Sequence, residues 1–441
     1  MAAVTNILTQ VQTYQRAGLA FLLNQSPFIA TSNTKFKDFE RITANLGSSV
    51  SFDKPPRYTD SDSLVITFQP SVQRVQVLTV DQQGSVGYEF SAQERIFNVD
   101  KDTESYMREF GRAAVYQLGS KVEKNVALNA ISGVISQNTG LPNITSGPFR
   151  FFGDGTTAIN SYGQLAQMIA NFKDFGAPSH DMKVYLPLTA VPAIVNSGLS
   201  QFTVNRGNEE AASWEIGEFG TPPVKYFQSN LLPIQFAGTV GNAGTTLTVV
   251  STNDPTGQNI SQITFSGATI NDANAIFYGD MFQFQDGVSG EPNLRFLTFI
   301  GNHVSQQPVQ FRATAAAGAN GSGDVTVNIY PTLQVGQPNN DNIGINTNIV
   351  AGMQVKVAPS HAAGVVIAGD AMFLGMPRLP DQSPFYTANE YDDETAVSMR
   401  MTYGALVFQN QQGMAHDVIW GSTWVPEYTM RILFPLSNLN P

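Results

Sequence analysis

Two aspartates, Asp280 and Asp286, stand six residues apart on either side of the short apolar run Met281–Phe284. Paired carboxylates held a short distance apart are the groups with which glycoside hydrolases supply acid and base. Each of these aspartates adjoins a glycine, Gly279 or Gly287, and Asp tolerates turn geometry because it can hydrogen-bond its own backbone. The pattern therefore favours two turns around a strand over a catalytic pair.

No other arrangement of reactive side chains has a recognisable spacing. The four histidines, His180, His303, His361 and His416, lie far apart, and no two have the HxxxH spacing of a helical metal site. The chain has no Cys, which excludes thiolate nucleophiles, disulfides and zinc–sulfur sites. It contains neither a GxSxG nucleophile elbow nor a GxxxxGK[ST] phosphate loop. The acidic run 392–394 lacks the alternating ligands of a calcium loop. We predict no catalytic residue, no cofactor and no metal site.

The composition points to a protein that lies against other protein. Charged residues make up 13% of the 441-residue chain, against about 25% in a typical soluble protein. Interfaces are depleted in Lys and Glu, although a β-rich surface that uses Ser and Thr would give the same composition. The formal net charge of -11 argues against an electrostatic grip on nucleic acid, since phosphate binding needs clustered Lys and Arg.

Neither end nor middle of the chain carries a membrane or export signal. The start, "MAAVTNILTQVQTYQRAG", has no basic region followed by an apolar core, and no run of about 18 apolar residues occurs. We expect a protein that is neither exported by a signal peptide nor membrane-spanning. Residues 3–15 have the apolar spacing of a short amphipathic helix, and the stretch after it has no clear period, as in an extended arm.

The first third of the chain predicts a long hairpin followed by a long helix. Strand patterns at 49–52, 64–68 and 72–80 flank the polar loop "KPPRYTDSDS". Apolar residues then recur every four positions from Tyr106 to Ala130, which predicts one helix over about 103–135, on the order of 50 Å long. Gly111 and Gly119 indicate a kink or a close packing contact within it.

The middle of the chain predicts an α+β unit and then a separate β module. Ser161 or Asn160 can cap a helix with a stripe at Tyr162, Leu165, Ile169 and Phe172, and "KVYL" follows as a strand. No lysine occurs between Lys225 and Lys356, and helical periodicity disappears there. Turn signals in this interval separate about six strand-like runs, which favours a small barrel or sandwich; the runs are 246–250, 260–265, 281–285, 294–300, 309–313 and 325–330. Strand patterns return in "GALVF", "DVIW" and "MRILF".

Four short segments, in this order, resemble a known family. They are Gly47-x-x-Val50-x-Phe52-x-x-Pro55, "VQVLTVDQQGSVGYEF" ahead of the long helix, "GDMFQF" in the β module and "MRMTYGALVF" near the end. Their order and spacing, and the succession of parts along nearly the whole chain, resemble the major capsid (coat) proteins of tailed bacteriophages. The closest likeness is to the short-tailed-phage type with an inserted β-barrel domain.

The resemblance implies an α+β fold of the tailed-phage major capsid type, with an inserted all-β barrel. Its parts would be an N-terminal arm, an extended loop, a peripheral domain with a long spine helix, the first part of an axial domain, the inserted barrel, and return strands with a tail, at 1–47, 48–90, 91–153, 154–234, 235–345 and 346–441. We expect residues 235–345 to fold as an autonomous barrel.

The resemblance also implies a function and partners. The chain would self-assemble as hexamers and pentamers into an icosahedral shell in the host cytoplasm and become the virion capsid. It would work with a separate scaffolding protein and a portal, and it would enclose double-stranded DNA without sequence-specific binding. In relatives a loop of the barrel reaches across twofold contacts, and the matching loop here is 251–259, where Asp254 is the only charged residue.

The hairpin tip is the other expected contact between subunits. Proline denies backbone donors and favours an extended path, while Arg, Tyr and Asp offer directional contacts. The residues assigned to this interface by hypothesis are Pro55, Arg57, Tyr58, Asp60, Asp62 and Asp254.

Three other functions stay open at this point. A β-rich surface or tail adhesin could bind glycans through aromatic residues exposed on the β module. A glycan-cleaving enzyme would need two acids about 5 to 10 Å apart in a groove, and no pair is preferred by the sequence. An encapsulin-type protein container would share the shell fold, although the inserted barrel makes this reading less favourable.

Overall fold

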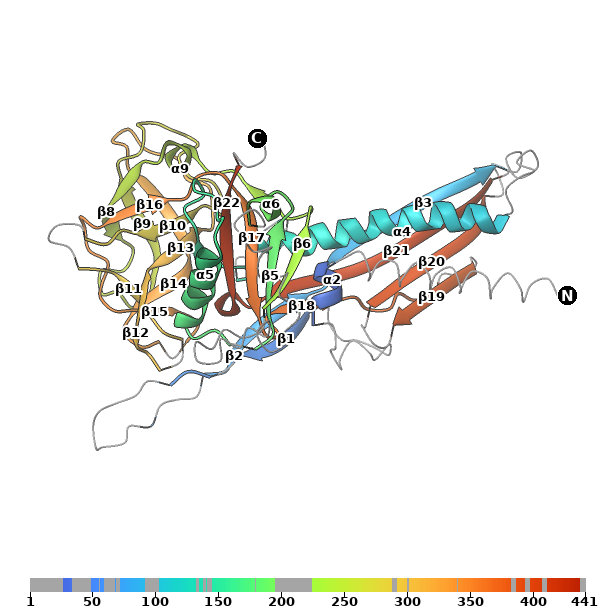
Figure 1. Ribbon diagram of the computed structural model, residues 1–441, viewed down its shortest axis with the longest axis horizontal. Helices are drawn as coiled ribbons and strands as arrows, with labels where there is room; N and C mark the ends of the chain where they lie inside the picture. Colours follow the sequence, from blue (N-terminus) through green and yellow to red (C-terminus); the bar gives the residue numbers. More distant parts are fainter. Residues whose placement is uncertain are drawn as a thin grey trace, which may run out of the picture.

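The computed structural model has an α+β architecture with an elongated outline, in which a β-barrel and a long helix with its sheet lie at opposite ends (Figure 1). The residues that it describes are 27–33, 49–54, 56–58, 68, 72–91, 103–131, 135–137, 140, 145–178, 180–194, 224–287, 292–299, 301–338, 340–381, 386–392, 397–406 and 411–436. The helix expected over 3–15 lies outside these residues. Within them, no helix is long and apolar enough to span a membrane.

The helix predicted over about 103–135 is present as α4, Thr103–Ala127, and ends earlier than predicted, in the 3₁₀ turn η1, Leu128–Ala130. It runs without interruption through Gly111 and Gly119 and spans about 37 Å. The described part of its apolar stripe is buried, including Leu118, Val122 and Val126. Spacing of four residues thus predicted both the helix and the face that it buries.

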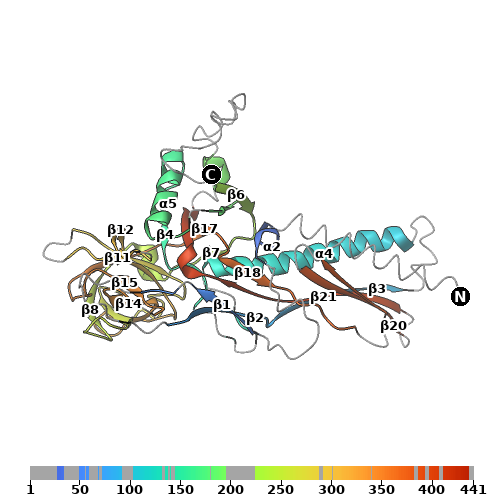
Figure 2. The same ribbon diagram turned by 90° about the horizontal axis from the view of Figure 1, so that it is seen from below.

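The face of α4 packs along an antiparallel sheet whose order is β18-β21-β20-β19, with β3 paired to β21. Its strands are β3 Gln82–Ser91, β18 Met372–Gly375, β19 Tyr386–Asp392, β20 Val397–Leu406 and β21 Gln411–Trp424. Figures 1 and 2 show the helix lying lengthwise on the sheet. Gly84 allows this close approach, because a Cβ there would lie 2.9 Å from Cδ1 of Leu118.

A second sheet crosses the middle of the molecule in the order β4-β22-β17-β5-β6, with β7 also paired to β17. Its strands are β4 Phe151–Phe152, β5 Met182–Pro187, β6 Val224–Ser229, β7 Ile234–Gln235, β17 His361–Ala368 and β22 Thr429–Pro435. Helix α5, Tyr162–Asp174, packs on it and begins with the predicted cap, since Ser161 and Gln164 form a reciprocal capping box. A short helix, α6, covers Val191–Ile194.

The lysine-free interval forms a closed barrel. Six strands ring it in the order β14-β13-β10-β16-β8-β9, and β9 pairs back to β14, while β15, β11 and β12 extend the sheet beyond β14. The strands are β8 Thr246–Thr252, β9 Ile260–Ser266, β10 Met281–Phe284, β11 Arg295–Leu297, β12 Val304–Pro308, β13 Gln310–Ala313, β14 Val325–Val335, β15 Ile343–Ile345 and β16 Gln354–Val357. Aromatic rings fill the barrel, with Phe282 and Phe311 stacked at 4.9 Å between centroids.

Two features of this barrel were not predicted from the sequence. Strand β16 closes the ring between β10 and β8, although it lies after residue 345. The barrel is also tied directly to the central sheet, because the side chain of Gln310 accepts from the N–H of Phe151 at 2.8 Å and donates to its carbonyl at 3.0 Å. Helix α9, Thr239–Ala243, leads into the barrel.

The predicted hairpin is a two-stranded ribbon, β1 Ser49–Lys54 and β2 Arg74–Thr79, below the centre of Figure 1. The strand run after it, β3, belongs to the sheet under α4. The ribbon's inner face holds Leu78 and Phe52, whose ring stacks on Phe373 at 4.2 Å. Its outer face is exposed and includes Val75 and Val77, which are 40% and 41% exposed.

Candidate functional site: the anchor of the ribbon

The base of the ribbon converges on one buried acid, Glu427. Its carboxylate lies 3.4 Å from Nζ of Lys54, 3.7 Å from Nη2 of Arg57 and 2.5 Å from Nη2 of Arg74. Glu427 belongs to η3, Pro426–Tyr428, the turn between β21 and β22, and Pro at its first position sets the backbone for that turn. We call Lys54, Arg57, Arg74 and Glu427 the ribbon anchor.

The ribbon's own register creates the need for this acid. Lys54 and Arg74 are directly opposite each other on β1 and β2, on the inner face. Like charges opposite each other destabilise an antiparallel pair unless another group compensates them. Burial alone would raise the pKa of Glu427, but the charges of Lys54, Arg74 and Arg57 outweigh it and hold the pKa below its ordinary value. The carboxylate is therefore ionised and neutralises the ribbon's inner face.

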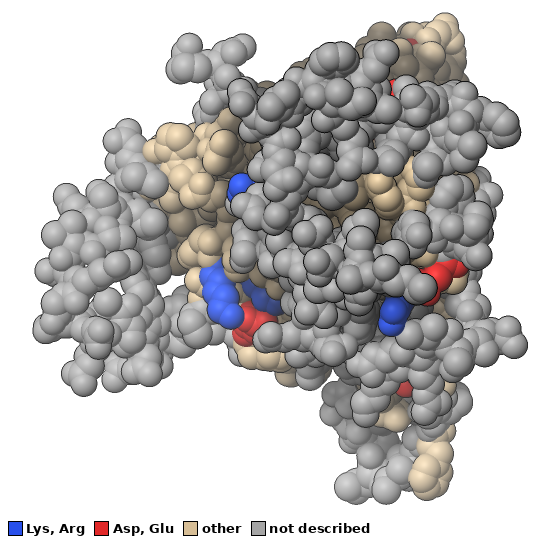
Figure 3. Space-filling view, turned by 90° about the vertical axis from the view of Figure 1, so that its right-hand side faces the viewer, with Lys and Arg blue, Asp and Glu red and all other residues tan. Residues whose placement is uncertain are grey.

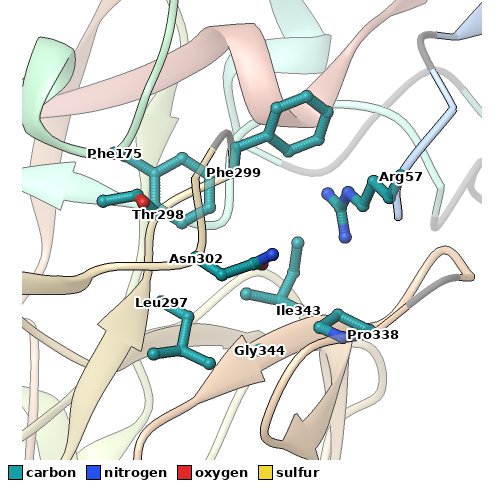
Figure 4. Close-up of a pocket in the computed structure, with 9 residues that line it drawn as sticks. All are labelled: Arg57, Phe175, Leu297, Thr298, Phe299, Asn302, Pro338, Ile343 and Gly344. Carbon is teal, nitrogen blue, oxygen red and sulfur yellow. The ribbon is translucent and has the colours of Figure 1, made fainter. Parts of the chain in front are cut away.

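The same cations also contact the barrel. Arg74 Nε donates to Asp341 Oδ1 at 2.8 Å, and Arg57 Nη1 donates to the carbonyl of Asn342 at 2.6 Å. The Arg57 guanidinium lies 4.1 Å from the ring centroid of Phe299 and extends into a small cavity between Phe299, Asn302 and the barrel strand β15 (Figure 4). Burial lowers the pKa of Arg57 to about 10, and the nearby Arg74 adds to this effect. The anchor joins ribbon, barrel and the β21–β22 turn.

Three further arginines are fully buried where the parts of the molecule meet, and they bond mainly to backbone carbonyls. Arg431 on β22 donates to Ala130 at the end of the spine at 2.8 Å and to Gly279 at the barrel base at 3.1 Å. Arg150 donates to the carbonyl of Glu427 at 3.2 Å, and Arg312 to that of Ser146 at 2.6 Å. Burial lowers the pKa of both Arg150 and Arg431 to about 9. The planar guanidinium of Arg can donate several hydrogen bonds at once, so it suits positions where several backbone segments meet.

The residues assigned to the interface by hypothesis fall in three different environments. Arg57 is buried in the anchor, within its own chain, and Tyr58 beside it is 55% exposed. Asp254 is exposed but occupied by its own loop, accepting from the backbone N–H of Thr256 at 2.9 Å and of Asn259 at 2.7 Å. Pro55, Asp60 and Asp62 lie outside the described residues. A contact with a neighbouring subunit stays a prediction for all six.

The two aspartates that could have formed a catalytic pair have separate partners. Asp280 is buried and accepts from the N–H groups of Phe277 at 2.8 Å and Gly238 at 3.0 Å, so it fixes the turn before β10. Burial raises its pKa to about 6. Asp286 pairs with Arg295 at 2.8 Å on the barrel surface. Both carboxylates therefore serve local structure.

The described histidines do not form a cluster that could bind a metal. Burial lowers the pKa of His361 to about 3 and that of His416 to about 4, so both are neutral near pH 7. No group of three or more His, Asp or Glu side chains that could hold a metal occurs within the described residues. Figure 3, which faces the α4 end of the molecule, shows scattered charged side chains rather than a patch among the residues drawn in colour.

Comparison with known proteins finds no matching family model and no curated protein that matches significantly. Solved structures do match, over most of this chain and most of theirs. They include "Mycobacterium phage Che8" (10% identity, 92% of this chain and 90% of that chain, TM-score 0.41). Two others are "Capsid structure of the Cyanophage P-SCSP1u" (13%, 91% and 89%, 0.37) and "Capsid of Ralstonia phage GP4" (8%, 92% and 88%, 0.38). At TM-scores this low the likeness carries no weight in assigning a function, which has to come from this chain's own geometry.

Proposed function

We propose that this chain is a structural shell subunit, a major capsid protein that assembles into an icosahedral shell enclosing a phage genome. The observation that carries the proposal is the ribbon: a two-stranded sheet with an exposed, partly apolar outer face, held to the body by a dedicated buried ion cluster. An isolated hairpin is marginally stable in water, so a rigidly anchored one serves to present its outer face to something else.

The outer face has the chemistry of a protein contact. Val75 and Val77 lie side by side with Asp53 and Ser51 across the ribbon, and Phe68 further along the hairpin is 92% exposed. Exposed apolar side chains in a row on a sheet invite docking of another chain. The low charge content of the whole chain supports the same reading, since a shell subunit meets neighbours on several sides.

The finer assignments belong to the same proposal. Residues 1–47 serve as the arm, 48–90 as the extended loop, and 91–153 as the peripheral domain with the spine helix. Residues 154–234 form the first part of the axial domain, 235–345 the inserted β-barrel domain, and 346–441 the return strands of the axial and peripheral domains and the C-terminal tail. The subunit is not an enzyme and takes no cofactor. A scaffolding protein and a portal assist assembly in the host cytoplasm, and the finished shell encloses double-stranded DNA.

Substitutions on the ribbon's outer face test the proposal. Val75→Lys with Val77→Lys keeps the ribbon intact, because Lys at position 75 faces Asp53 and both side chains point away from the body. Sedimentation velocity should show the wild-type chain in large particles and the double variant as folded subunits. A wild-type chain that sediments only as a monomer, or a double variant that forms normal particles, would contradict the role given to this face.

A further inference from the structure

A short segment near the N-terminus is fastened to the spine helix by a single acid. Helix α2, Pro27–Thr31, lies against α4, and the carboxylate of Glu123 accepts from the backbone N–H of Phe28 at 2.8 Å and of Ile29 at 3.1 Å. Each oxygen of the Glu123 carboxylate accepts one of these two hydrogen bonds, so both oxygens hold the segment in place. We call residues 27–33 the strap.

The remaining contacts of the strap come from one continuous surface. The ring of Phe28 stacks on Tyr185 at 4.2 Å and packs near Trp424 at 6.0 Å. Nζ of Lys183 donates to the carbonyl of Thr31 at 3.1 Å, and the N–H of Asn33 donates to the carbonyl of Met372 at 2.9 Å. The strap therefore bridges α4, β5 and β18, and it would leave all three together if it detached.

Glu123 is buried without a compensating cation. Its side chain is 1% exposed, and it forms no ion pair among the described residues. The groups that face this region are the phenol of Tyr185 and the Lys183–Asp181 pair, both on or beside β5, while Lys121 and Lys124 of α4 lie on that helix's exposed side. The ammonium group of Lys183 forms a salt bridge with Asp181 and a hydrogen bond with the Thr31 carbonyl, and not with Glu123.

We propose that the strap docks reversibly on the spine helix and that its docking is coupled to uptake of a proton by Glu123. When the strap is in place, the backbone N–H groups of Phe28 and Ile29 occupy both oxygens of this carboxyl, and Glu123 is buried. An ionised carboxylate shielded from water without a cation is costly, and protonation removes that cost at the loss of one accepting oxygen. Detachment returns the carboxyl to solvent, where it ionises freely.

The direction of the pH dependence follows from this linkage. Burial raises the pKa of Glu123 to about 7, against the opposing effect of the bonds from Phe28 and Ile29, compared with an ordinary value of 4.5. The docked state thus binds a proton more tightly than the detached state, so acid favours docking and the preference is lost as pH rises from 4.5 through about 7. Since one pKa unit is tenfold, the docking equilibrium changes by up to about 300-fold across this range.

Hydrogen exchange of the full-length chain tests the proposal. The protection factors of the strap amides, corrected for intrinsic exchange, are measured at intervals from pH 4 to pH 8. In the wild-type chain they should fall as pH rises, by up to about 300-fold. In Glu123→Gln, which is isosteric and cannot titrate, they should stay level. Flat wild-type protection, or protection that increases with pH, overturns the proposal without reference to any variant.

Two matched variants test whether a carboxyl elsewhere in the chain causes the pH dependence. Glu89→Gln changes an exposed acid on β3, and Asp280→Asn removes the buried carboxyl whose pKa is raised by burial to about 6 in the barrel. Both should keep the wild-type pH dependence of the strap. If Glu123→Gln also keeps it, Glu123 is not the coupled group and the proposal fails. Protection of barrel strand β14, measured in the same spectra, reports whether each variant is folded.

Discussion

Neutralising Glu427 should loosen the ribbon more than any other single change of charge in the described chain. The substitution Glu427→Gln keeps the size of the side chain and removes its charge, and it leaves Lys54, Arg57 and Arg74 facing one another. Among the described residues, the other acid paired with this group is Asp341, whose side chain is 60% exposed and which forms a salt bridge with Arg74.

The structure gives the expected magnitude. Arg74 and Glu427 have side chains 1% and 5% exposed, so solvent screens their interaction little. Removing one partner of a buried ion pair costs about 3 to 5 kcal/mol, because a buried charge is left without compensation. Acid should act in the same direction: since the pKa of Glu427 is lowered, its contribution is present above the ordinary pKa and is lost as pH falls through the lowered one.

The assay is urea unfolding combined with hydrogen exchange of β1 and β2. Asp286→Asn is the matched control, because it breaks a pair of similar length, 2.8 Å, whose acid is 37% exposed. That change should cost about 1 kcal/mol or less. Glu427→Gln should lower stability several-fold more and expose the amides of β1 and β2 first. Equal, small effects of the two substitutions would refute the assignment of Glu427 as the ribbon's anchor.

Two further predictions concern the hairpin tip and the barrel. Arg57→Ala should destabilise the subunit by about 1 to 3 kcal/mol, because it removes a charge-assisted hydrogen bond and a cation stacked on Phe299. Tyr58→Ala should leave the melting temperature of the subunit nearly unchanged, because that side chain is 55% exposed. Equal melting temperatures for the two variants would contradict the anchor geometry. The structure changes the expectation that residues 235–345 fold alone: this fragment lacks β16 and should give a poorly dispersed amide spectrum. A fragment of residues 236–360 contains all six ring strands and should fold; dispersed spectra from both would show that β16 is dispensable for closure.

The elements that could be predicted from the sequence are those with local causes. The stripe from Ala114 to Val126 needs only a four-residue repeat, and the start of α5 follows from the Ser161–Gln164 capping box. Turn residues such as those around Asp280 mark strand ends by their own backbone preferences. All six predicted strand runs are present for the same reason, five of them in the ring, while the run 294–300 is β11, which lies beyond β14 and outside the ring. Strands β12, β15 and β16 were not predicted. The first two pair with nearby strands, β11 and β14, whereas β16 is fixed by pairing with β8, about a hundred residues earlier in the chain.

The candidate site could not be predicted because it is assembled by tertiary contacts. Arg74 and Glu427 are separated by 353 positions, and no spacing rule joins them. One signal was nevertheless in the sequence: Glu427 and Arg431 are the two charged residues in the largely apolar stretch 418–436. A charge in a run that must be buried needs a partner, since burying it alone is too costly. The sequence therefore predicts that Glu427 and Arg431 each make a buried polar contact, but it does not predict with which residue.

Electron microscopy of the purified full-length chain tests the central claim most directly. If the chain is a shell subunit, the micrographs will contain closed, uniform particles, and a reconstruction will place the outer face of each ribbon, with Val75 and Val77, on a neighbouring copy. Fields that contain only dispersed single subunits, from a preparation shown to be folded by its hydrogen exchange, would contradict the claim.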